Sequence, residues 1–125
     1  MNRFRNVPGI WNPEQVTAWK KVTDGVHSKG GYIFLQLWAL GRAADAEFLK
    51  SKGHSVVSAS NIPMPGGAVP GALSKDGVSK YVQAYAVAAR NAVFDAGFDG
   101  VEIHNANGYR TYLELNAIFS QSRTI

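Results

Sequence analysis

The fold is decided by an apolar run at residues 32–38, Tyr32-Ile33-Phe34-Leu35-Gln36-Leu37-Trp38. Aromatic and branched side chains favour a β-strand, and a nearly continuous apolar run is typical of a parallel strand covered on both faces. Gln36 is the single polar residue in the run. A shorter stretch, Gly100-Val101-Glu102-Ile103-His104, predicts a second strand.

Two helices are predicted from their caps and their apolar spacing. The first begins after Asn12, a good N-cap, with Pro13 at the first helical position and Gln15 placed to complete a capping box. It ends at Gly30-Gly31, and its apolar face is expected to comprise Val16, Trp19, Val22 and Val26. The second begins after Ser74 and stops at Gly97, with an apolar stripe of Val78, Tyr81, Val82, Tyr85, Ala86, Ala89 and Val93.

The segment between the first strand and the second helix, residues 39–73, is the least regular. A short helix is expected at residues 43–49, and residues 62–71 hold three prolines and three glycines, which exclude a regular element. A last helix is expected at residues 112–119. The order of helix, strand, loop, helix and strand predicts one βαβ unit with parallel strands.

This order supplies only part of a known architecture. A closed (β/α)8 barrel takes about 250 residues, and this chain provides about two of its eight strands with flanking helices. We therefore expect an α/β fold in which residues 1–125 form a fragment of a (β/α)8 TIM barrel domain.

Composition excludes several classes of protein. The chain has 125 residues, 46% of them apolar and 18% charged, which suits a soluble globular domain. There is no cysteine, so disulfides and zinc-thiolate sites are excluded, and no ligand spacing suggests a metal. The net charge is +4, but the basic residues are scattered, so we expect no nucleic acid partner. No apolar run of about 18 residues suggests a membrane span, and a cytoplasmic location is expected.

Polar residues follow both predicted strands, where α/β enzymes place their functional groups. Gln36 and Trp38 end the first, and His104, Asn107 and Tyr109 end the second or follow it. A histidine, an amide and a phenol that converge can hydrogen-bond a substrate oxygen and deliver a proton.

Each of these residues also has a purely structural interpretation. Gln36 could be a buried amide bonded to backbone, Trp38 a core residue, His104 a satisfied structural histidine and Tyr109 a rim residue whose hydroxyl meets water. Glu102 could be a catalytic carboxylate, although a paired structural charge is the better expectation. The other histidines, His27 and His54, are expected at the surface.

Several motifs, in order and at matching spacing, resemble the old yellow enzyme family of flavin-dependent ene-reductases, and they are most similar to its fungal members. The signature is Val101-Glu102-Ile103-His104-Asn105-Ala106-Asn107-Gly108-Tyr109, and Phe34-Leu35-Gln36-Leu37-Trp38 is similar to the third barrel strand of the family. Further matches are Pro8-Gly9-Ile10-Trp11, residues 14–20, 88–93 and 96–100. The resemblance covers residues 7–109, whereas residues 110–125 depart from the pattern of the family, and so does Gly77, where the family favours glutamate.

The resemblance implies non-covalently bound FMN in a (β/α)8 barrel, with NAD(P)H as the reductant and an α,β-unsaturated carbonyl compound as the substrate. It implies that Gln36 hydrogen-bonds the flavin ring and that Trp38 lines the substrate pocket. His104 and Asn107 would hold the substrate carbonyl oxygen, and Tyr109 would protonate the α-carbon. The arginine near the flavin and the phosphate-binding loops of the family belong to its later strands.

Two functions from different classes follow. The first is an FMN-dependent NAD(P)H oxidoreductase that reduces the C=C bond of α,β-unsaturated carbonyl compounds. The alternative is a truncated, inactive remnant of such an enzyme with an interaction role. Because part of a barrel exposes sheet edges, we expect the isolated chain to self-associate through them or to be poorly ordered, above all in residues 39–73 and 110–125.

Overall fold

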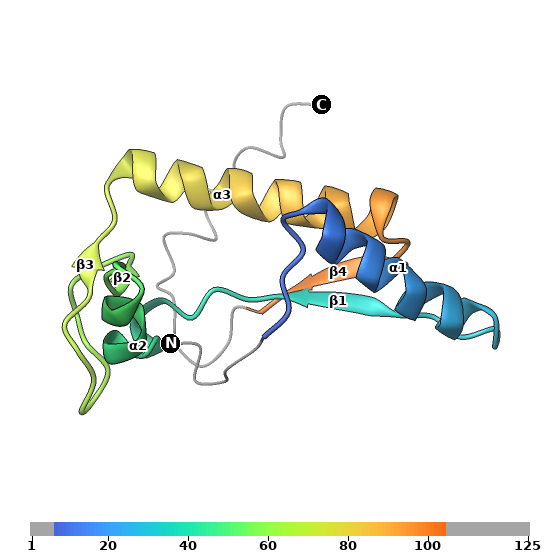
Figure 1. Ribbon diagram of the computed structural model, residues 1–125. Coiled ribbons are helices and arrows are strands. Elements are labelled where there is room, and N and C mark those ends of the chain that lie inside the picture. Colours follow the sequence, from blue (N-terminus) through green and yellow to red (C-terminus); the bar gives the residue numbers. More distant parts are fainter. Residues whose placement is uncertain (1–6, 105–125) are drawn as a thin grey trace. The chain divides into compact units, whose positions relative to one another are not determined.

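A computed structural model describes residues 7–104, which divide into two compact units (Figure 1). The first, the strand-pair unit, comprises residues 8–38 and 83–104. The second, the loop unit, covers residues 39–82 together with Val7. The predicted helix at residues 112–119 lies outside the described residues.

The strand-pair unit is built on β1 (Phe34–Leu37) and β4 (Gly100–Ile103), which pair in parallel. Figure 1 shows the two strands side by side. The chain between them includes α3 (Lys75–Arg90), so the predicted βαβ order is confirmed. The register places Phe34 opposite Gly100 and Gln36 opposite Glu102.

The prediction that the first strand is covered on both faces is wrong for the described residues. Successive side chains of a strand point to opposite faces. Leu37 is 7% exposed on one face, whereas Phe34 is 63% exposed on the other. We call the second face, which carries Phe34, Gln36, Gly100 and Glu102, the open face.

Helix α1 (Pro13–His27) begins as the sequence predicts. The Asn12 side chain accepts a hydrogen bond from the Gln15 backbone N–H, and the Gln15 side chain accepts one from the Asn12 N–H. Its buried face differs from the prediction, because Val22 is 45% exposed and Thr23 is fully buried. The Thr23 hydroxyl donates to the Ala96 carbonyl oxygen at 2.6 Å, which allows a polar side chain to take the core position.

Helix α3 (Lys75–Arg90) also begins as predicted, since the Ser74 hydroxyl accepts from the Gly77 N–H. It continues as a π-helical turn, η2 (Asn91–Asp95), which shifts the inward face along the chain. Ala92, inside this turn, is fully buried. Ala86, which the sequence placed in the apolar stripe, is exposed. Gly97 follows with a φ of +77°, and its role as the stop is confirmed.

The core of the strand-pair unit joins α1 to the chain that leads into β4. The ring of Trp19 meets that of the buried Phe98 edge to face, with centroids 5.4 Å apart. The Trp19 indole N–H donates to the Gly9 carbonyl oxygen, and the Asn91 amide donates to the Ile10 carbonyl oxygen. These bonds fix the segment before α1 against the unit.

The loop unit holds η1 (Gly41–Ala43), α2 (Ala46–Ser51), β2 (Val57–Ser58) and β3 (Gly71–Ala72). The helix predicted at residues 43–49 therefore starts three residues late, because Asp45 caps α2 by accepting from the Phe48 N–H. The strands β2 and β3 form a two-residue parallel ladder that the sequence did not predict. Gly71, placed in the irregular stretch, belongs to β3.

Among residues 7–104, no helix is both long enough and apolar enough to cross a membrane.

Candidate functional site

The open face is arranged in layers along the strand pair. In the first layer the ring of Phe34 lies across Gly100, where an added Cβ would stand 2.6 Å from the Phe34 Cε1 atom. Only glycine leaves room for the ring there. The second layer is Gln36 with Glu102, and Trp38 and His104 follow at the carboxyl ends of the strands. Inward side chains stacked in layers are the way in which the interior of a parallel barrel is filled.

In the second layer, Gln36 donates from Nε2 to Glu102 Oε1 at 3.0 Å. Both residues are exposed, so the interpretation of Gln36 as a buried amide bonded to backbone is wrong. Within residues 7–104, this is the one hydrogen bond of either side chain. The charge of Glu102 is paired with a neutral amide and not with a cation, contrary to the structural ion pair expected from the sequence.

At the carboxyl ends, the rings of Trp38 and His104 meet edge to face, with centroids 5.1 Å apart and an angle of 83°. The His104 backbone N–H donates to the Leu37 carbonyl oxygen at 2.9 Å, which carries the strand ladder one residue beyond β4. Trp38 is 39% exposed and is therefore not a core residue. The structure thus brings together three predicted site residues, Gln36, Trp38 and His104.

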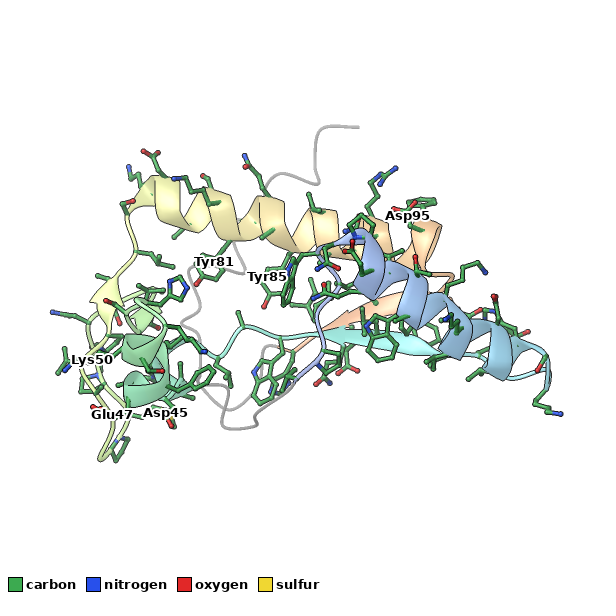
Figure 2. The ribbon with its side chains drawn as sticks, viewed as in Figure 1. Asp45, Glu47, Lys50, Tyr81, Tyr85 and Asp95 are labelled. Atoms are coloured by element: carbon green, nitrogen blue, oxygen red, sulfur yellow. The ribbon has the colours of Figure 1, made fainter. Side chains whose placement is uncertain are left out.

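The other two predicted site residues, Asn107 and Tyr109, lie outside the described residues. His27 and His54 are exposed, as expected. Tyr81 and Tyr85 lie one turn apart on α3; Tyr81 is half-buried and Tyr85 is 9% exposed (Figure 2). Residues 7–104 contain no group of three His, Cys, Asp or Glu side chains that could hold a metal ion.

The amino ends of the same strands are joined by one carboxylate. Asp99 accepts from His27 Nε2 at 2.9 Å and from the Ile33 N–H at 2.8 Å. These two hydrogen bonds, the one from His27 above all, hold the pKa of the Asp99 carboxyl below its ordinary value. Asp99 therefore ties the end of α1 to the starts of both strands, away from the polar groups at the carboxyl ends.

Two of these contacts were missed by the sequence reasoning. The pairing of Gln36 with Glu102 could not be found without the strand register, although each residue stands two positions before one of the rings that the structure pairs, Trp38 and His104. Side chains two apart on a strand share a face. Asp99 and His27 are 72 residues apart in sequence, and no local sequence pattern predicts their contact.

Polar groups at the carboxyl ends of parallel strands are the arrangement in which α/β folds place their functional groups. Comparison with known proteins identifies the family. The family model described as "NADH:flavin oxidoreductase / NADH oxidase family" matches residues 2–120, and the chain belongs to this family. The match extends beyond residues 7–109, which carry the quoted motifs.

Two curated relatives and one solved structure place the chain more closely. The "NADP-dependent oxidoreductase lnbE" of Aspergillus flavus is 55% identical, and the "Probable inactive dehydrogenase easA" of Claviceps purpurea is 57% identical, each over 107 residues. Each match covers 85% of this chain and 28% of the relative. The crystal structure of Old Yellow Enzyme from Pichia sp. AKU4542 is 38% identical with a TM-score of 0.79, over 86% of this chain and 30% of that one.

These matches establish that the chain has part of the barrel fold of old yellow enzymes, as the sequence predicted. The chain spans about 28% of the length of the two curated relatives. One relative is named as an oxidoreductase and the other as inactive, so membership of the family does not by itself assign an activity.

Proposed function

We propose that the chain carries the flavin-ring contact and the carbonyl-binding groups of an FMN-dependent NAD(P)H oxidoreductase that reduces the C=C bond of α,β-unsaturated carbonyl compounds. The observation that carries this proposal is the shared open face, on which Gln36, Trp38 and His104 come from the carboxyl ends of two adjacent parallel strands. We also propose that residues 1–125 form a fragment of one FMN-binding barrel domain.

The open face suits the ring part of FMN. The Gln36 amide offers a carbonyl acceptor and an N–H donor, and the edge of a flavin ring presents both N–H and carbonyl groups. The flavin, when bound, supplies hydride transfer between the nicotinamide and the substrate. The protein supplies the binding groups, their orientation and the proton.

The proposed roles of the residues follow from where charge develops. A hydride that reaches the β-carbon of the substrate drives negative charge onto its carbonyl oxygen. His104 and Asn107 donate hydrogen bonds to that oxygen and stabilise the charge. Tyr109 then gives its phenolic proton to the α-carbon, because a phenol with an ordinary pKa near 10 keeps its proton at neutral pH. Trp38 lines the pocket beside His104.

A second function stays open because one close relative is named as probably inactive. In this alternative, the chain is a truncated remnant that keeps the family's residues without catalysis and acts through its surfaces. Titration with FMN, followed by quenching of flavin fluorescence, separates the two functions. Saturable binding at micromolar concentrations supports the oxidoreductase, and the absence of binding supports the remnant.

A substitution then tests the carbonyl-binding group. His104→Phe keeps an aromatic ring against Trp38 but removes both ring nitrogens. We expect kcat/KM for an enone to fall about 100-fold to 1,000-fold, the usual effect of losing one such donor, with little change in FMN affinity. The matched control is His54→Phe, at an exposed histidine of the loop unit, which should leave kcat/KM unchanged. An unchanged rate in His104→Phe would remove this histidine from the mechanism.

A further inference from the structure

Glu102 is an unusual residue for its position. It lies inside a β-strand, where glutamate is disfavoured, and its side chain is exposed on the open face. Its one hydrogen-bond partner among residues 7–104 is the side-chain amide of Gln36, at 3.0 Å. None of the ion pairs found in that part of the chain involves Glu102. The carboxylate therefore does not serve as half of a salt bridge here.

The contact has a direct consequence for Gln36. A carboxylate accepts hydrogen bonds and cannot donate them, whereas a side-chain amide can present either its NH2 group or its oxygen to a neighbour. Beside Glu102, the amide must turn its NH2 group toward the carboxylate. The Gln36 Oε1 atom is then the acceptor that is left on the open face, with the second N–H beside it.

We propose that Glu102 is a positioning residue, which fixes the orientation of the Gln36 amide so that Oε1 accepts a hydrogen bond from a ring N–H of the flavin. This inference rests on the proposed function and deepens it. With the amide reversed, an N–H would face an N–H, and the hydrogen bond would be replaced by a repulsion. Glu102 thus acts through Gln36 and does not itself touch the ring.

A double-mutant cycle on FMN binding tests the inference. Glu102→Gln keeps the size of the side chain but can bond Gln36 in either sense, and Glu102→Leu removes the acceptor completely. We expect each to raise the Kd for FMN about threefold to fivefold, because the Gln36 amide is no longer held in one orientation and its side chain must be ordered when the ring binds. In a Gln36→Ala background, the same changes should alter Kd less than twofold, because the group that Glu102 positions is absent.

The matched control is Glu47→Gln, which makes the same change of charge on α2 in the loop unit (Figure 2). It should leave the Kd unchanged. An equal increase in the Kd for FMN when Glu102→Gln is made in the wild type and in the Gln36→Ala background would overturn the inference, since Glu102 would then act without Gln36. A Kd for FMN that Glu102→Gln and Glu102→Leu leave unchanged would overturn it as well.

A readout without FMN separates this inference from the proposed function. In a 15N-labelled chain, we expect one side-chain amide proton of Gln36 to resonate downfield of ordinary glutamine, and to return to the ordinary position in Glu102→Leu. An ordinary position in the wild type would overturn the inference. A wild-type chain that does not bind FMN overturns the proposed function and this inference with it. A wild-type chain that binds, with variants that bind equally well, overturns the inference alone.

Discussion

Replacing Thr23 with valine tests how α1 is held against the end of η2. Thr23 is fully buried, and its hydroxyl donates to the Ala96 carbonyl oxygen at 2.6 Å, across 73 residues of sequence. Valine has nearly the same shape, so the change removes the donor without opening a cavity. It leaves the Ala96 carbonyl without this donor in the core.

The expected loss follows from that burial. An unsatisfied polar group in a protein interior costs about 1–3 kcal/mol, and an added methyl group offsets only part of this. We therefore expect the free energy of unfolding to fall by about 2 kcal/mol. At roughly 4 °C for each kcal/mol, the midpoint of thermal unfolding should fall by roughly 8 °C.

Urea unfolding followed by circular dichroism measures this loss. The matched control is Thr17→Val, because Thr17 lies on the same helix and is exposed. The control should stay within about 0.5 kcal/mol of the wild type. If Thr23→Val and Thr17→Val unfold at the same urea concentration, the bond to Ala96 does not hold α1 in place and the reasoning is refuted.

Four further outcomes are expected. Asp99→Asn should lower the free energy of unfolding above about pH 3.9, the ordinary pKa of an aspartate. In urea unfolding, this loss of stability should vanish as the pH falls through the lowered pKa of Asp99. A loss that does not change with pH would contradict the role of its hydrogen bonds to His27 and Ile33. Gly97→Ala should cost roughly 1–2 kcal/mol in the same assay because of its φ of +77°, and an unchanged stability would exclude that strain. In a form that turns over an enone, Tyr109→Phe should slow protonation of the product more than reduction of the flavin in stopped-flow experiments, and equal slowing would exclude a proton donor. Sedimentation equilibrium should show self-association through the strand edges, and a monomer at all concentrations would contradict it.

Local signals in the sequence predicted the starts of α1 and α3. The capping residues lie within four residues of the helix ends that they cap: Asn12, Pro13 and Gln15 at α1, and Ser74 at α3. Each cap can therefore be recognised in one short stretch of sequence. The two strands of the strand-pair unit were predictable for the same reason, since each is one short apolar run. The ladder of β2 and β3 was not, because two residues carry no periodicity.

Contacts distant in sequence were harder to predict. The choice of Thr23 over Val22 for the core depends on a carbonyl acceptor 73 residues away. The pairing of Gln36 with Glu102 depends on the register of two strands, which neither strand specifies alone. For the candidate site, Gln36, Trp38 and His104 were found from the family's motifs, whereas Glu102 as the partner of Gln36 required the register.

The contacts that hold the strand-pair unit together are separate from the groups proposed to carry chemistry. Thr23 and Asp99 join helices and strand starts, whereas Gln36, Glu102 and His104 lie on the open face and at the carboxyl end. Substitution of Gln36 or Glu102 should therefore cost little stability, since both side chains are exposed and exposed positions are generally tolerant. A protein with this fold can therefore lose the chemistry and keep the fold, and the relatives of this chain include both a named oxidoreductase and a probably inactive dehydrogenase at similar identity. The FMN titration of the Gln36 and Glu102 variants addresses two of the proposed groups directly, without changing the contacts of Thr23 and Asp99.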